Sequence, residues 1–153
     1  MLQAMRKRME DDKGFTLIEL MVVVLIIAIL IAIAIPTFLG LRERAQDRAA
    51  QSDLRNGLTA AKAFYTDGET FVNFNVAAGT DIEPSLTWVL GAGAAGQVGI
   101  TLADADEVVL TTVSESTEQF CIADSETVGT VRGRGAGAAA AATYAACEGL
   151  ADW

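Results

Sequence analysis

The chain of 153 residues contains no histidine, and it has only two cysteines and two prolines. Histidine is the commonest general base in enzymes and the commonest metal ligand, so its absence removes the usual starting point for hydrolytic or zinc-dependent catalysis. The two cysteines, Cys121 and Cys147, lie too far apart in sequence for a C-x-x-C redox pair, and no serine stands in a nucleophile motif. We therefore do not expect the chain to be an enzyme.

Basic residues are also scarce. Lys and Arg number 11 against 20 Asp and Glu, which gives a formal net charge of −9. Such a surface repels nucleic acid unless basic side chains gather locally. After Lys62 the only bases are Arg132 and Arg134, within Val-Arg-Gly-Arg-Gly. This pair could contact DNA or an acidic patch on another subunit, and a mobile glycine-rich loop with two solvated arginines is the simpler interpretation.

What the sequence does have is a long apolar run near its N-terminus. The 22 residues from Leu20 to Leu41 carry no charge. As a helix they reach about 33 Å, which is enough to cross a hydrocarbon core of about 30 Å. Glu19 stands directly before the run, and no Lys or Arg lies between Phe15 and Arg42 to pair with it. A carboxylate near a bilayer interior costs a few kcal/mol, so this acid needs a partner or a task.

The junction before the run, Lys-Gly-Phe-Thr-Leu-Ile-Glu, resembles the processing site of type IV prepilins and of type II secretion pseudopilins over residues 13–40. The resemblance implies that a prepilin peptidase cuts between Gly14 and Phe15 on the cytoplasmic side of the membrane and N-methylates Phe15. The cationic amine of Phe15 would then neutralise Glu19 of a neighbouring copy. The acid would be an assembly device.

Pro36 falls where this family has its helix-bending proline. Ala28 departs from the family pattern, because many pilins carry glycine at that site and alanine favours the helix by about 1 kcal/mol. Two simpler interpretations remain open: a permanent single-span anchor, and a secretory signal peptide with a small-x-small site at Ala32-Ile33-Ala34. The anchor leaves the Gly-Phe-Thr-Leu-Ile-Glu junction unexplained. The signal peptide conflicts with the length of the apolar run and the acid at its head.

Residue pattern and resemblance together predict an α+β fold with four segments. A long N-terminal helix, transmembrane in its first half and bent near Pro36, should pack its second half on a small antiparallel β-sheet, which is the pilin fold. The segments expected are a cleaved leader (1–14), a transmembrane and filament-core helix (15–41), an amphipathic continuation of that helix (42–66) and a globular β-sheet head (67–153).

The continuation of the helix carries an apolar stripe, because Leu54, Leu58, Ala61 and Tyr65 recur at helical spacing. Asp67-Gly68 should end the helix. Residues 67–85 then read as a partly packed connecting loop. Short β-prone runs follow, with a hairpin turn at 103–106. We expect strands at 86–90, 97–102, 107–113, 119–123 and 127–131.

An exported protein meets an oxidising compartment, so we expect Cys121 and Cys147 to be bridged, with two buried free thiols as the alternative. Closing a loop of about 26 residues would stabilise the head by roughly 3 to 4 kcal/mol in the chain-entropy model. In pilins a C-terminal disulfide bounds a surface-exposed region. Residues 121–147 resemble that region in place and size, and we expect a disulfide-bounded loop there.

Two further patterns carry little weight. The segment 91–96 matches G-x-G-x-x-G, but the residues after it are strand-like and do not open a helix, so a flexible turn or a close backbone contact explains it better. Major pseudopilins bind calcium near their sheet, and the resemblance makes three acids weak calcium candidates although the EF-hand spacing is absent. These acids are Asp104, Asp106 and Glu107. We expect no cofactor.

The function expected is that of a structural subunit of a type IV pilus, a helical filament of identical copies used for adhesion, twitching motility or DNA uptake. The resemblance implies a prepilin peptidase, an assembly ATPase and an inner-membrane platform as partners, with DNA or a host surface as further candidates. The precursor would lie in the inner (cytoplasmic) membrane, and the assembled form in an extracellular pilus or a periplasmic pseudopilus. A type II secretion pseudopilin and a non-polymerising membrane-tethered binding module are the alternatives, and the cysteine pair favours the pilin.

Overall fold

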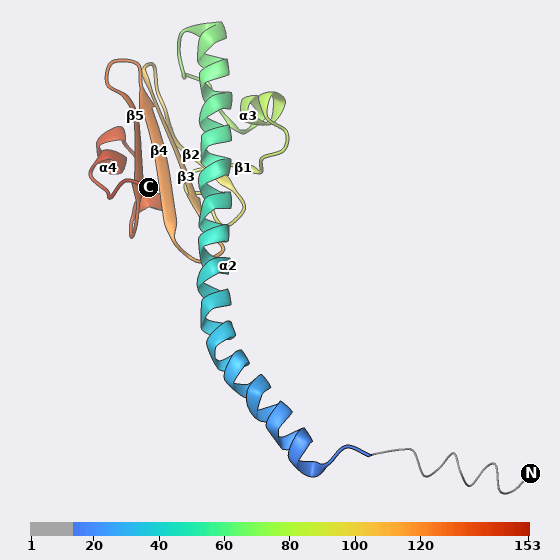
Figure 1. Cartoon of the computed structure of the whole chain (residues 1–153). Helices are drawn as coiled ribbons and strands as arrows, with labels where there is room; N and C mark the ends of the chain where they lie inside the picture. The colour runs from blue at the N-terminus through green and yellow to red at the C-terminus, as the bar shows by residue number, and fades with distance from the viewer. Residues whose placement is uncertain (1–13) are drawn as a thin grey trace, which may run out of the picture. The chain divides into compact units, whose positions relative to one another are not determined.

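The computed structural model describes residues 14–153. The predicted leader therefore lies outside the described residues, apart from Gly14. By its internal contacts the chain forms two compact units, Met1–Leu41 and Arg42–Trp153. The elements are shown in Figure 1. In chain order they are α2 (Leu17–Gly68), α3 (Val76–Ile82), β1 (Trp88–Leu90), β2 (Val98–Ala103), β3 (Glu107–Val113), β4 (Gln119–Ser125), β5 (Gly129–Arg134), the 3-10 turn η1 (Ala138–Ala140) and α4 (Tyr144–Glu148).

Helix α2 is continuous over 52 residues and belongs to both units. It begins at Leu17, two residues later than predicted, and ends at Gly68 as expected. The helix runs through Pro36, which has no N–H to donate to the carbonyl of Ala32. The hydroxyl of the next residue, Thr37, donates to the carbonyl of Ile33 at 3.0 Å. The bend predicted at this position stays a prediction.

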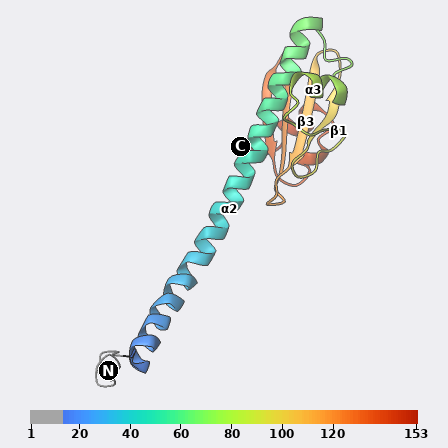
Figure 2. The ribbon, with the colours of Figure 1, turned by 90° about the vertical axis from the view of Figure 1, so that its right-hand side faces the viewer.

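From residue 42 onward α2 lies along one face of the sheet (Figure 2). The predicted apolar stripe is buried there: Leu54, Leu58 and Ala61 are all less than 8% exposed. Gly57 allows the close approach, because a Cβ at this position would lie 3.2 Å from the side chains of Leu110 and Val98. The sheet contributes alternate residues to this core, as one face of a pleated strand must. They are Val98, Ile100, Val108, Leu110, Phe120 and Ile122.

The sheet has the strand order β1-β2-β3-β4-β5, and its last four strands pair antiparallel as predicted. The prediction was wrong for β1, which pairs parallel to β2. The chain returns from the end of β1 to the start of β2 over the short segment 91–97, where Gly91 and Gly96 adopt positive φ angles of 83° and 72°. A Cβ on Gly93 would lie 2.5 Å from the carbonyl oxygen of Thr111, so this loop also folds back against β3. The α+β class itself is confirmed.

The segment predicted as a plain connecting loop contains the helix α3. Asn75 caps this helix, because its side-chain oxygen accepts hydrogen bonds from the backbone N–H groups of Ala77 and Ala78 at 2.9 and 3.2 Å. Gly79 of α3 lies against the ring of Trp88, where a Cβ would be 2.7 Å from the nearest ring atom. Loop 67–85 is therefore anchored to the start of the sheet.

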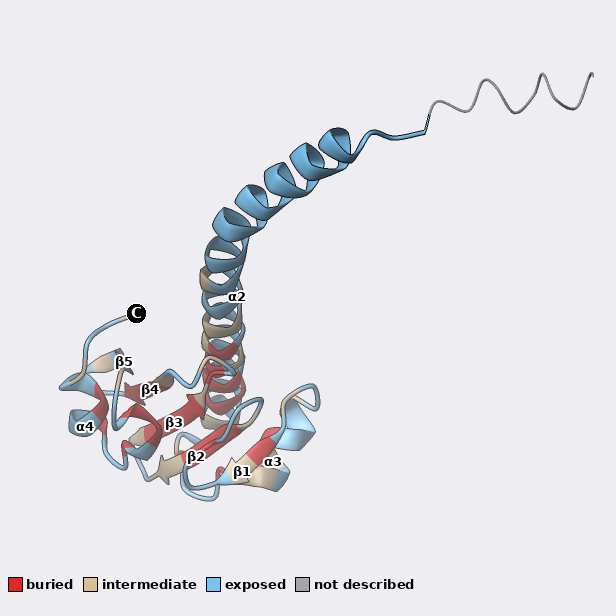
Figure 3. Cartoon of the chain, turned by 90° about the horizontal axis from the view of Figure 1, so that it is seen from below, coloured by how far each residue is buried: buried red, intermediate tan, exposed pale blue. Residues whose placement is uncertain are grey.

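The opposite face of the sheet is covered by the C-terminal segment, so the head has three layers (Figure 3). The segment bounded by the two cysteines contains β5, close to the strand expected at 127–131, together with η1 and most of α4. They bury a second core, because the odd-numbered residues of β3 and β4 point away from α2. This core consists of Val109, Cys121, Ala123, Ala138, Ala141, Tyr144 and Cys147.

Candidate functional site

The side chain of Glu19 is engaged at the beginning of α2. Thr16 precedes the first helical residue, and both its backbone N–H and its hydroxyl donate to Oε2 of Glu19, at 2.9 and 2.7 Å. The N–H of Glu19 donates in turn to the Thr16 hydroxyl oxygen at 3.2 Å. This reciprocal pattern is a capping box, and it satisfies two donors that the helix itself leaves free.

Glu19 therefore has a partner within its own chain, which the sequence analysis did not identify. The signal was present, since Thr-x-x-Glu before an apolar helix is the usual capping-box pattern. The negative charge also lies at the positive end of the helix dipole. The proposed pairing with the amine of a neighbouring copy is not tested by these contacts, because a carboxylate has a second oxygen that can accept further hydrogen bonds.

The predicted cleavage site is accessible. Gly14, Phe15 and Thr16 precede the helix and are exposed, and the Phe15 side chain is 90% exposed. A protease needs a reachable backbone, and this segment lies outside the helix and is exposed. Residues 1–13, which include Lys13, lie outside the described part of the chain.

The helix that follows presents an apolar surface on all sides. Nineteen large apolar side chains between Phe15 and Leu41 are each at least 48% exposed. By length and composition this part of α2 can cross a membrane, and none of the apolar window is buried within the chain. A helix that is apolar all round is stable only in lipid or against other protein. The surface therefore requires an environment that the single chain does not supply.

Two contacts fasten α2 to the head on the side of β4 and β5. The amine of Lys62 lies 2.8 Å from Oδ1 of Asp124 and donates to the hydroxyl of Thr130 at 3.2 Å. The Thr130 hydroxyl also donates to Asp124. Asp124 is buried, so its charge depends on these partners.

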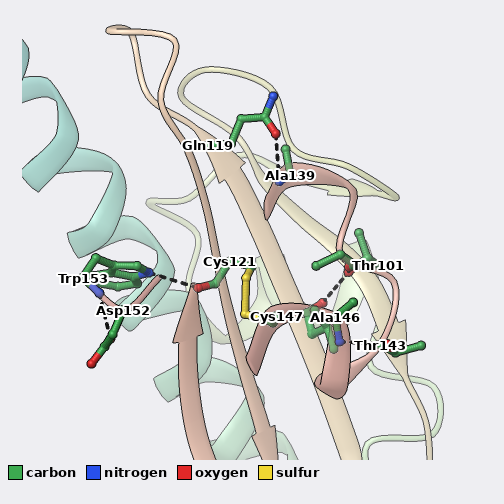
Figure 4. Close-up of a disulfide and its surroundings, with 11 residues drawn as sticks. Thr101, Gln119, Cys121, Ala139, Thr143, Ala146, Cys147, Asp152 and Trp153 are labelled. Atoms are coloured by element: carbon green, nitrogen blue, oxygen red, sulfur yellow. Dashed lines mark hydrogen bonds between the residues drawn. A yellow bond between two sulfur atoms is a disulfide. The ribbon is translucent and has the colours of Figure 1, made fainter. Parts of the chain in front are cut away.

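The second contact is made by Trp153. Its ring lies between two guanidinium groups, with the Cζ atoms of Arg55 and Arg132 at 4.9 and 5.6 Å from the ring centroid. Its indole N–H donates to the carbonyl of Cys121 at 3.2 Å (Figure 4). Arg132 and Arg134 belong to strand β5. The interpretation of this stretch as a mobile loop was therefore wrong, although both arginines are exposed as that interpretation expected.

The disulfide prediction is confirmed. Cys121 of β4 and Cys147 of α4 are bonded, with their Cα atoms 6.0 Å apart (Figure 4). Both residues are fully buried. The bond fixes the C-terminal segment to the middle of the sheet, and the alternative of two free thiols is wrong.

The two weaker motifs have structural roles. The G-x-G-x-x-G segment forms the turn between β1 and β2, with a close backbone contact at Gly93 as expected. Asp104, Asp106 and Glu107 lie at the turn between β2 and β3, where Asp104 accepts a hydrogen bond from the N–H of Ala105 at 2.8 Å. Among residues 14–153 no three Asp, Glu, Cys or His side chains converge as metal ligands.

Comparison with known proteins places the N-terminal region in a defined group. Residues 9–35 match the family model of the prokaryotic N-terminal methylation motif. The chain is 44% identical over 63 residues to a type IV major pilin protein of Myxococcus xanthus, with 41% of this chain and 29% of the relative covered. It is 39% identical over 95 residues to a type IV major fimbrial protein of Dichelobacter nodosus, with 60% of this chain and 61% of the relative covered.

A type II secretion system core protein G of Vibrio cholerae is 44% identical over 48 residues, with 31% of this chain and 33% of the relative covered. The matches thus span between 29% and 61% of the length of these relatives. No solved structure gives a significant match.

The chain thus combines an exposed apolar helix, a methylation motif at the head of that helix, and a β-sheet packed on its second half. Over its N-terminal part it is similar to type IV major pilins and to a type II secretion system core protein.

Proposed function

We propose that the chain is the structural subunit of a type IV pilus, with a mechanical and not a catalytic role. The observation that carries the proposal is the apolar surface of α2 between Phe15 and Leu41, which nothing in the described chain covers. Copies that place these helices side by side would bury that surface. The similarity to major pilins over the same region supports this role.

Processing at the head of the helix would prepare the subunit. Hydrolysis of the Gly14–Phe15 peptide bond by a prepilin peptidase leaves a carboxylate on Gly14 and a new amine on Phe15. Methylation of that amine by a methyl donor keeps it cationic. While the subunit lies in the inner membrane, the contact with Thr16 satisfies the carboxylate of Glu19. During assembly this carboxylate would pair with the Phe15 amine of an adjacent copy.

Assembly would move the apolar helices from lipid into the core of a fibre. Apolar surface removed from water stabilises by about 25 cal/mol per Å², so many copies side by side make a durable polymer without covalent links. An assembly ATPase and an inner-membrane platform would supply the work of extraction. The proposed uses of the extracellular fibre are adhesion, twitching motility and DNA uptake.

A second candidate is a pseudopilin that forms a short periplasmic fibre for type II secretion. The similarity to a core protein G of Vibrio cholerae favours it. The pilin remains the first choice because the chain carries the Cys121–Cys147 disulfide of a pilin-like C-terminal region. A non-polymerising tether would share the membrane helix and make no fibre at all.

Replacement of the acid tests the role of the helix. In a strain that makes surface fibres from this chain, Glu19→Ala should reduce the yield of sheared fibres by roughly tenfold or more, since a buried charge pair would be lost at every subunit. Glu43→Ala is the matched control, because Glu43 is an exposed acid of the same helix beyond the apolar run. Unchanged fibre yield in Glu19→Ala would contradict assembly through this acid, and no fibres in the parent strain would favour the pseudopilin or the tether.

A further inference from the structure

Four of the five basic residues of α2 lie in one line along the helix. At about 100° per residue, Arg44, Arg48, Arg55 and Lys62 fall within about 40° of one another around the helix axis. Arg42 lies about 160° away from Arg44, on another face. We call these four residues the basic stripe.

The two halves of the basic stripe differ in what they contact. Lys62 pairs with Asp124 at 2.8 Å, and Arg55 lies over the ring of Trp153 at 4.9 Å. Arg44 and Arg48 are exposed, and within residues 14–153 the structure shows no ion pair or ring contact for either one. The stripe thus continues beyond its partners in its own head, toward the apolar part of the chain.

The opposite end of the head is acidic. Where α2 ends, the turns of the sheet are tied together, because Phe71 donates to the carbonyl of Ala105 at 3.2 Å and Glu126 to that of Asp106 at 3.1 Å. Four exposed acids gather there. We call them the acidic end: Glu69, Asp104, Asp106 and Glu126.

The negative charge of this acidic end raises the pKa of Tyr65. The pKa of Tyr65 is raised to about 12, mainly by the hydrogen bond that its hydroxyl donates to Glu126 and in part by the charges of Asp106 and Glu69. The imbalance extends over the whole head, since residues 67–153 contain thirteen acids and only two bases. The head of one chain therefore offers the negatively charged partners that Arg44 and Arg48 lack among residues 14–153 of their own chain.

We propose that Arg44 and Arg48 of one copy dock on Asp104 and Asp106 at the acidic end of a second copy of this chain, so that heads stack end to end. This inference rests on the proposed filament. The distance fits an axial stack, because Arg44 lies 24 residues, or about 36 Å of helix, before the end of α2. The two surfaces are different, so the contact is heterologous and leads to an open polymer instead of a closed dimer.

Anionic lipid headgroups are the competing partner for arginines next to a membrane segment. A headgroup layer surrounds the helix and would use Arg42 as readily as Arg44. Docking on a second copy depends on the face of the helix. Arg42→Glu is therefore the control variant, since it makes the same change in charge two residues away on another face.

The test is a charge-swap series in the full-length chain, with sheared fibres quantified against the membrane pool by immunoblot. Arg44→Glu with Arg48→Glu should reduce fibre yield by roughly tenfold or more, because like charges would meet at every subunit. Adding Asp104→Lys with Asp106→Lys to that variant should restore most of the yield. Arg42→Glu should stay near the parent value.

Each other outcome has a defined meaning. A parent that forms fibres together with a double reversal that leaves yield unchanged would overturn the docking contact and leave the filament proposal standing. Equal loss in Arg42→Glu, or no recovery in the fourfold variant, would also overturn it. If the double reversal is degraded, Arg44→Gln with Arg48→Gln replaces it, and a smaller loss of yield is expected while Arg42→Gln stays near the parent value. A parent without fibres would remove the proposed function first.

Discussion

Single side chains make polar contacts at the two ends of α2. At its beginning, Thr16 and Glu19 cap the helix and satisfy a carboxylate that would otherwise face lipid unpaired. Near its end, Tyr65 donates to Glu126 across to the turn between β4 and β5. Both contacts join polar groups at the margins of apolar regions, where an unpaired group is expensive.

The two tyrosines of the chain should ionise only at strongly alkaline pH. The hydrogen bond to Glu126 raises the pKa of Tyr65 to about 12, and burial is the main cause that raises the pKa of Tyr144. Absorbance of the folded protein at about 295 nm should show less tyrosinate at pH 10 than that of the denatured chain, which is half ionised there. Tyrosines of the folded protein that ionise near pH 10 would contradict the raised pKa of both residues.

The same shift predicts how stability depends on pH. Because the folded pKa of Tyr65 lies above the ordinary value of about 10, its contribution is complete below pH 10 and is lost as pH rises toward 12. Tyr65→Phe should flatten this part of the stability curve, and its remaining absorbance change should belong to Tyr144 alone.

Residue types predicted only part of the chemistry at this scale. The cysteine pair was predicted correctly from export, and the capping box was available in Thr-x-x-Glu but was overlooked. The position of Trp153 between Arg55 and Arg132 was out of reach, because it joins three segments whose proximity is set by the sheet.

At the scale of elements, strands were predictable because β-branched runs are bounded by turn residues. Strand β3 was predicted with its observed bounds, and β4 and β5 differ by two or three residues at their ends. Pairing direction was harder, since β1 is three residues long and the chain returns to the start of β2 through positive-φ glycines, a connection that the expected antiparallel sheet did not include. Helix α3 was missed although Asn75 before Val-Ala-Ala is a cap signal.

The C-terminal elements should depend on their disulfide. Replacing both Cys121 and Cys147 by Ser should lower the free energy of unfolding by roughly 3 to 4 kcal/mol, because the unfolded chain loses a loop constraint of about 26 residues. Denaturant unfolding of the full chain in detergent measures this. The parent protein after reduction is the matched control and should behave as the double variant does. Equal stability with and without the bond, or two titratable thiols in the untreated protein, would contradict the prediction.

At the scale of the whole molecule, two properties point to assembly. The first unit exposes an apolar surface that needs other helices or lipid, and the second unit has Arg44 and Arg48 at one end and exposed acids at the other. The sequence predicted the first property, because an uncharged apolar run of this length is typical of a membrane-spanning helix. The second became visible only when the fold placed separate turns together.

The account depends on one covalent event, because the charged amine that would pair with Glu19 exists only after processing. Intact mass and N-terminal fragment spectra of subunits from purified filaments test this most directly. The account predicts a chain that begins with N-methylated Phe15 followed by Thr-Leu-Ile-Glu. Filament subunits that retain residues before Phe15, or that begin at another residue, would contradict it.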